Sequence, residues 1–185
     1  VERERDVMLN IFEQKRQPLG DNAKYYEAQR RPDAIGVAVP PVMQKLLAHV
    51  GYPRLYINAV AERQELEGFR LGAADMADQE LWDWYVANNL DIESTLGHTD
   101  SLVHGRAYIT ISKPDPKIDV GADPNVPIIR VEPPTSLYAV IDPRTRQVTK
   151  AIRAVYDDEG SQVIMATLYL TDKTLGWIRD QGQWK

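Results

Sequence analysis

The sequence predicts an α+β fold, with an N-terminal helical arm, a helical segment and then an antiparallel β meander. Apolar residues recur at helical spacing through most of the first 104 residues. From residue 128 onward, short β-type runs alternate with turn sequences. A chain that groups its helices before its strands is typical of the α+β class.

The first helix is expected over residues 3–17, because apolar side chains lie on one face and charged side chains on the other. Pro18 and the glycine that follows it predict the end of this helix. A second short helix is expected over residues 23–30. An extended connector is expected over residues 34–41, and another short helix over residues 42–50.

Alternating helices and strands are expected next: a helix over 53–64, a strand over 66–71, and helices over 79–88 and 92–104. Asp78 and Asp91 are predicted to cap the last two helices, and Gly105 to end the second of them. A strand over 107–111 and a proline-rich loop over 114–127 follow. The predicted meander strands are residues 128–131, 137–141, 151–156, 163–170 and 175–179.

Two regions are expected: a helical arm over residues 1–33 and an α+β domain over residues 34–185. The arm helices are too short to be stable alone, so they need a surface to pack on. An exposed apolar stripe is typical of a contact with another subunit. The candidate subunit-contact residues are Val7, Leu9, Ile11 and Phe12.

Composition excludes several classes of protein. The chain has no cysteine, so disulfides and thiolate chemistry are excluded. Its formal net charge of −5 argues against a surface that binds DNA phosphates throughout. No run of residues approaches the roughly 20 apolar residues that a membrane span needs, so we expect no membrane contact.

No catalytic, cofactor-binding or metal site is predicted. His98 and His104 are spaced too far apart for a helical zinc pair. Phosphate-binding glycine loops are absent, and aspartates are common at helix caps. The aromatic residues Trp82, Trp84 and Tyr85 favour core packing over base stacking. Solvated loops and strands explain the basic clusters Arg30–Arg31 and Arg144, Arg146, Lys150, Arg153.

The order of short motifs resembles that of tailed-bacteriophage portal proteins, of the siphophage head–tail connector type. Those proteins carry a Tyr-Tyr pair before a basic turn, then a helix ending in Arg and a Gly-Phe strand. They continue with a Trp-containing helix, an Asn-Leu-Asp step, a helix with His and Asp, and an Asp-Pro turn. The matching segments are Lys24–Arg31, Tyr56–Arg63, Leu66–Arg70, Leu81–Trp82, Asn89–Asp91, His98–Asp100, Leu102–Gly105, Ala107–Ile109, Val131–Pro134 and Ile141–Pro143.

The resemblance implies a structural subunit of a dodecameric ring at one capsid vertex, with no enzymatic activity. Its implied partners are copies of itself, the capsid or scaffold protein, the terminase that hydrolyses ATP, and the head–tail adaptor. Double-stranded DNA would pass through the ring without sequence-specific binding. The implied location is the virion, after synthesis in the bacterial cytoplasm.

Portal subunits of this type continue into a stem, a clip and a crown. These 185 residues lack them, so the resemblance implies a fragment made of the arm and much of the wing. Two alternatives remain open at this point. One is another phage structural or adaptor module, and the other is a small metal-dependent hydrolase that uses the aspartates.

Overall fold

The chain divides into two compact units, and the first is discontinuous in sequence. The computed structural model describes residues 2–29, 51–72, 76–116, 119–180 and 182–185. Unit 1 comprises residues 1–21 and 133–185, and unit 2 comprises residues 22–132. The α+β class is confirmed. The predicted boundary at residues 33 and 34, the connector at 34–41 and the helix at 42–50 lie outside the described residues.

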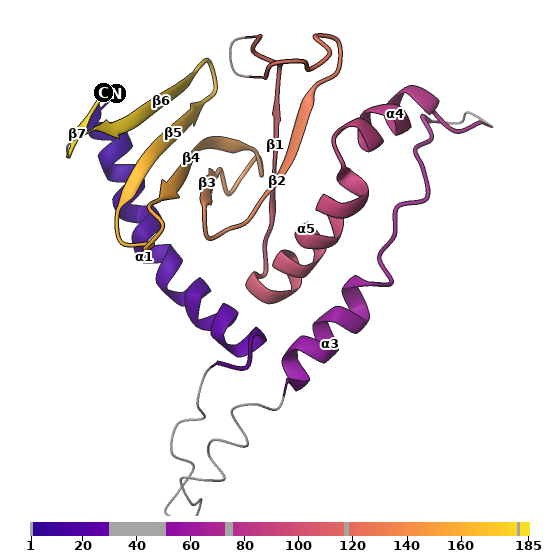
Figure 1. Cartoon of the computed structure of the whole chain (residues 1–185), viewed down its shortest axis with the longest axis horizontal. Coiled ribbons are helices and arrows are strands. Elements are labelled where there is room, and N and C mark those ends of the chain that lie inside the picture. Colours follow the sequence, from indigo (N-terminus) through magenta and orange to yellow (C-terminus); the bar gives the residue numbers. More distant parts are fainter. Residues whose placement is uncertain (1, 30–50, 73–75, 117–118, 181) are drawn as a thin grey trace, which may run out of the picture. The chain divides into compact units, whose positions relative to one another are not determined.

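Unit 1 is a five-stranded antiparallel meander with a helix along one face (Figure 1). Each strand pairs with the next along the chain, as the turn spacing predicted. The sheet ends in a two-residue strand that the sequence pattern did not reveal. Its elements are α1 (Glu2–Tyr26) as far as residue 21, β3 (Leu137–Ile141), β4 (Val148–Tyr156), β5 (Val163–Leu170), β6 (Thr174–Asp180) and β7 (Gln183–Trp184).

The core of unit 1 lies between α1 and the middle of the sheet. Met8 and Phe12 of α1 are fully buried there. Opposite them, the register pairs Ile152 with Leu168, and Ala154 with Ala166. The side chains of the alanines are short, so they leave room above the sheet for the large side chains of the helix. The side chains of β4 and β5 therefore receive the apolar stripe of α1.

The predicted break at Pro18 is wrong, because α1 continues through it to Tyr26. A proline inside a helix removes one hydrogen bond and crowds the preceding turn. Here the next residue, Leu19, is buried on the same stripe as Met8 and Phe12. Burial of Leu19 favours continuing the helix, and so offsets the local penalty of the proline.

In its described residues, unit 2 combines three helices with a two-stranded antiparallel sheet. The middle of α5 packs on β2, and α3 and α4 both contact α5. In Figure 1, α5 runs beside this small sheet. The elements are α3 (Tyr52–Ala61), α4 (Gln79–Ala87), α5 (Leu90–His104), β1 (Tyr108–Ser112) and β2 (Ile128–Glu132). Because β2 pairs with β1, the prediction that residues 128–131 belong to the meander is wrong.

The helix ends in unit 2 follow local capping chemistry. The Asp78 carboxylate accepts a hydrogen bond from the Leu81 backbone N–H at 3.1 Å, which confirms the predicted cap of α4. Gly105 ends α5 with a φ of +74°, as expected of a left-handed terminus. The N-cap of α5 is Asn89, so Asp91 lies in the first turn and the predicted start was too late.

The segment 66–71 forms no strand, contrary to its alternating pattern. An alternating segment becomes a strand only where a neighbouring backbone satisfies its hydrogen bonds. Here the side chain of Phe69 packs on Trp82 and Tyr85 instead, with ring centroids 6.4 and 5.8 Å apart. The aromatic contact, rather than strand pairing, fixes the course of this segment.

The side chain of Asn88, at the C-terminal end of α4, connects that helix to β2 through hydrogen bonds. Its amide nitrogen donates to the carbonyls of Trp84 and Pro127, each at 2.9 Å. Its side-chain oxygen accepts from the Ile129 N–H at 2.8 Å. One side chain thus satisfies backbone groups on both elements.

Gly97 sets the close approach of α5 to β2. A Cβ atom at this position would lie 3.0 Å from the Cγ1 of Val131. That separation is shorter than ordinary van der Waals contact, so a larger residue forces either the helix or Val131 to move.

We expect Gly97→Leu to lower the free energy of unfolding by about 1 to 3 kcal/mol through overpacking. Urea unfolding followed by circular dichroism measures the change. Adding Val131→Ala opens space at the contact, so the double variant should recover part of the loss. Equal losses in the single and double variants would show that Val131 is not the limiting contact.

Candidate functional site

The four candidate subunit-contact residues lie on α1 in different environments. Phe12 is fully buried in the core of unit 1, and Leu9 packs partly against that core. Ile11 is half-buried, whereas Val7 is 49% exposed. The chain itself therefore supplies a surface for Phe12 and Leu9. The contact of these residues with another subunit stays a prediction.

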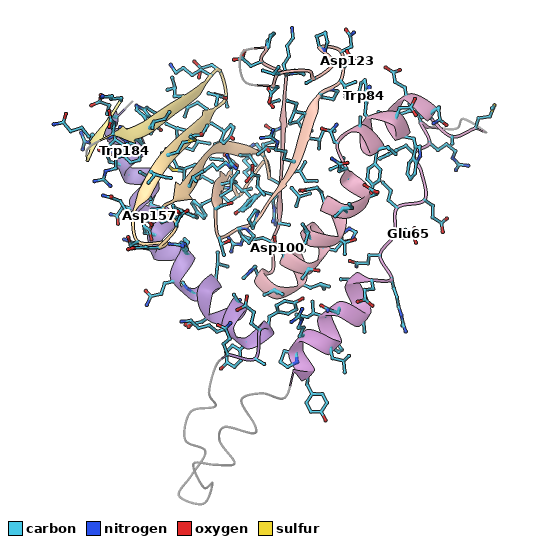
Figure 2. The ribbon with its side chains drawn as sticks, in the orientation of Figure 1. Glu65, Trp84, Asp100, Asp123, Asp157 and Trp184 are labelled. Atoms are coloured by element: carbon cyan, nitrogen blue, oxygen red, sulfur yellow. The ribbon has the colours of Figure 1, made fainter. Side chains whose placement is uncertain are left out.

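Arg5 is buried on the same face of α1 and lies between two tryptophans. Its guanidinium carbon lies 5.3 Å from the ring centroid of Trp177 and 4.9 Å from that of Trp184. Figure 2 labels Trp184, on the last strand of the sheet. A guanidinium over an aromatic face is attracted by the ring quadrupole, and more strongly where water is excluded. Arg5 therefore attaches the first turns of α1 to β6 and β7.

Not every hydrogen-bond donor of Arg5 has an acceptor within the described residues. Its Nη2 lies 2.7 Å from the exposed Asp6 carboxylate. Its Nη1 is buried and has no hydrogen-bond partner there. The sequence did carry a signal for this arrangement. Arg5, Met8 and Phe12 share one helical stripe, so an arginine occupied a position expected to face the core.

Polar contacts along the edges of α1 set its position on the sheet. Lys150 donates to Glu4 at 2.9 Å, and this partner holds the pKa of Glu4 below its usual value. The Tyr156 hydroxyl donates to Glu13, and Arg16 lies 3.7 Å over the Tyr156 ring centroid. Burial, followed by the Glu13 hydrogen bond, raises the pKa of Tyr156. Lys150 is thus engaged within its own chain.

Of the three histidines, the structure describes His98 and His104. In the part of the chain that the structure describes, no group of three histidine, aspartate or glutamate side chains is placed to hold a metal ion. His98 and His104 each have a buried Nδ1 without a hydrogen-bond partner among the described residues. His49 lies outside those residues.

His104 and Asp100 are both half-buried on α5, and burial shifts the pKa of each (Figure 2 labels Asp100). Burial lowers the pKa of His104, and the charge of Asp100 partly opposes that shift. Burial likewise raises the pKa of Asp100. Both shifts disfavour the charged form, which is the expected effect of desolvation.

We expect acid to destabilise the chain through His104. Its folded pKa lies below its unfolded value, so between the two the unfolded chain binds more protons. The free energy of unfolding should therefore fall as the pH drops through the unfolded value of about 6.5. His104→Gln removes this contribution, which urea unfolding at a series of pH values measures. An equally steep fall in the variant would contradict the assignment.

Three aspartates that could be candidates for metal chemistry, Asp78, Asp83 and Asp91, each have a different structural role. Asp78 caps α4, and Asp83 accepts a hydrogen bond from Gln79 at 2.8 Å. Asp91 lies in the first turn of α5. Asp75 lies outside the described residues. Asp78, Asp83 and Asp91 thus have the capping and surface positions expected of this residue type.

The aromatic residues of α4 behave largely as predicted for core packing. Tyr85 is buried and stacks on Trp82, with centroids 5.1 Å apart and an interplanar angle of 18°. Trp84 points from the same helix and is half-buried (Figure 2). The stacked pair forms one wall of a cavity that is described below.

Several motifs that are distant in sequence meet in unit 2. The Tyr26 hydroxyl donates to the Asn58 side chain of α3 at 2.7 Å. Phe69 packs on Trp82, and Val131 of β2 approaches Gly97 of α5. Two pairs of the motifs that carried the resemblance are therefore in direct contact, those with Tyr26 and Asn58 and those with Phe69 and Trp82.

Comparison with known proteins gives the same family. Residues 6–184 match the phage portal protein family described as SPP1 Gp6-like. The chain belongs to this family. The match extends from the second turn of α1 to the last strand of the sheet, so it includes both units. The predicted resemblance to portal proteins is confirmed.

Two curated relatives are similar over nearly the whole chain. The portal protein of Mycobacterium phage D29 is 63% identical over 180 residues, and that of Mycobacterium phage L5 is 62% identical over the same length. Each alignment includes 97% of this chain and 37% of the relative. The chain thus spans a little over a third of their length. Among the described residues, no helix has the length and apolar character to cross a bilayer.

Proposed function

We propose that this chain is the arm and wing part of a structural, non-enzymatic portal subunit. Such a subunit forms a dodecameric ring at one vertex of the capsid. DNA enters and leaves through the ring, which also joins the head to the tail. In this proposal the capsid or scaffold protein, the terminase and the head–tail adaptor are its partners, and the virion is its location.

The observation that carries this proposal is the family match over residues 6–184, at 63% identity to a curated portal protein. Identity at this level extends over both units, rather than over one motif. Asp78 caps a helix and Asp83 accepts a surface hydrogen bond, and such structural roles agree with a subunit that performs no catalysis.

Val7 is the candidate residue best placed for the proposed subunit contact. Phe12 fills the core of its own unit, so its substitution would test folding rather than assembly. Val7 is exposed and lies on the same helix. In the full-length subunit, Val7→Asp should weaken ring formation measured by native mass spectrometry. Asn10→Asp, at a nearby exposed position, is the matched control.

A chimeric phage tests the function directly. In a mycobacteriophage, the part of the portal gene that aligns with these residues is replaced by the corresponding part of this chain. We expect plaques and DNA-filled heads, because the two segments share 63% of their residues. The same chimera with Phe12→Asp should fail, since a charge in the core prevents folding. If the unmodified chimera accumulates normally but heads remain empty, the proposed function is wrong.

A further inference from the structure

A cavity of about 260 Å³ lies in unit 2, where the end of α3 and the following segment meet α4 and the first turns of α5. Its walls combine aromatic and acidic side chains. Among them are Glu62, Glu65, Trp82, Tyr85, Asp91 and Ser94. Figure 2 shows Glu65 on the segment between α3 and α4.

The aromatic wall of this cavity is held rigidly. Trp82 and Tyr85 are stacked, and Phe69 meets Tyr85 edge-on at 66°. The Tyr85 hydroxyl and the Ser94 hydroxyl are hydrogen-bonded at 3.0 Å. Because packing and this hydrogen bond fix the rings, a ligand that stacks on them loses little entropy to reorganisation of the wall.

The charge of the cavity is negative. Glu62, Glu65 and Asp91 contribute carboxylates, and no lysine, arginine or histidine lines the cavity. Within the described residues, none of the three carboxylates has an ion-pair partner. Their fields therefore add at the opening and favour a cationic ligand over a neutral or anionic one.

A planar cation can contact the aromatic wall and the carboxylates of the cavity at the same time. A guanidinium stacks on aromatic faces and donates paired hydrogen bonds to carboxylates. An ammonium group is also attracted to an aromatic face, but it cannot stack flat on the ring or donate a planar pair of hydrogen bonds to a carboxylate. The combination of a stacked aromatic wall with unpaired carboxylates therefore selects arginine over lysine.

The backbone beside the cavity indicates that the arginine belongs to a peptide segment. Residues 65–68 belong to no helix or strand, and no backbone hydrogen bond joins them to another described residue. Glu65 and Leu66 of this stretch also line the cavity. Backbone groups that have no partner in the described part of the chain can pair with a second chain by strand addition.

We propose that this cavity binds an arginine side chain carried by an extended segment of a partner protein. The segment pairs with the backbone of residues 65–68, and its guanidinium stacks on Trp82 between the carboxylates of Glu62, Glu65 and Asp91. The inference concerns a local site, so it does not depend on the proposed portal function.

The probe is a capped pentapeptide, alanine-threonine-arginine-threonine-alanine, titrated into the protein. Binding is followed by the indole N–H signal of Trp82 in nuclear magnetic resonance, assigned with Trp82→Phe. We expect a saturable change in the chemical shift of this signal. Added salt should lower the affinity of the peptide. Replacing the arginine by neutral citrulline should weaken binding about tenfold or more, and lysine should bind more weakly than arginine. Equal binding of the citrulline peptide, or preference for lysine, would overturn the proposal.

Variants of the cavity rim locate the site. Glu65→Gln should weaken binding of the arginine peptide several-fold. Glu67→Gln is the matched control, because Glu67 is exposed in the same segment but does not line the cavity. Free arginine amide should bind more weakly than the pentapeptide, since it cannot pair with residues 65–68. Equal losses in the two variants, or equal affinity for free arginine amide, would count against the site.

Discussion

Phe12→Ala should lower the free energy of unfolding of unit 1 by about 3 to 5 kcal/mol, the usual range for truncating a buried aromatic residue. The ring is fully buried among Met8, Ile152 and Leu168. It also approaches the Tyr156 ring, with centroids 6.5 Å apart. Its removal leaves a cavity that a rigid sheet cannot close. Urea unfolding followed by tryptophan fluorescence measures the loss.

Val7→Ala is the matched control for this prediction. Val7 lies on the same helix but is 49% exposed, so its truncation should change stability by less than about 0.5 kcal/mol. If the two variants lose equal stability, α1 does not pack on the sheet through Phe12. A large loss for Phe12 alone would also explain why this residue is unsuited to a test of subunit contact.

Arg5→Ala should lower the free energy of unfolding by about 2 to 4 kcal/mol, because it removes a desolvated cation from two tryptophan faces. The Arg5 side chain lies within 5.3 Å of both ring centroids and is 5% exposed. Its loss also detaches the first turns of α1 from β6 and β7. The fluorescence of Trp177 and Trp184 should shift to longer wavelength as water reaches the rings.

Arg5→Met separates the charge from the apolar stem of the side chain. Methionine fills much of the same volume but has no positive charge. If the cation–π contacts stabilise the fold, Arg5→Met should lie between the parent and Arg5→Ala. A methionine variant as stable as the parent would show that packing alone holds α1 to the last strands, since the unpartnered Nη1 is itself unfavourable.

The elements that local chemistry determines were predictable from sequence. The meander strands followed from their turns, since Asp142 accepts backbone hydrogen bonds from Arg144 and Thr145 as turn residues do. The Asp78 cap and the Gly105 terminus followed from helix-end preferences. The order of the motifs also predicted the portal family, which the comparisons confirmed.

Three of the wrong predictions share one cause, which is packing or pairing with another segment of the chain. Pro18 predicted a break, but burial of Leu19 continues the helix. Alternation in residues 66–71 predicted a strand, but Phe69 packs on Tyr85 and the segment forms no strand. The pairing of β2 with β1 and the cavity beside Trp82 likewise depend on contacts that no local pattern specifies.

The discontinuity of unit 1 has a consequence for the way a ribosome delivers this chain. The first 21 residues leave the ribosome long before residues 133–185, against which they pack. Unit 2 is complete in the meantime and is able to fold first, as domains generally fold as units during synthesis. Until the last strands emerge, Met8 and Phe12 remain exposed to water. The nascent chain thus carries a helix with an exposed apolar face, which a chaperone can bind until β4 and β5 have been made.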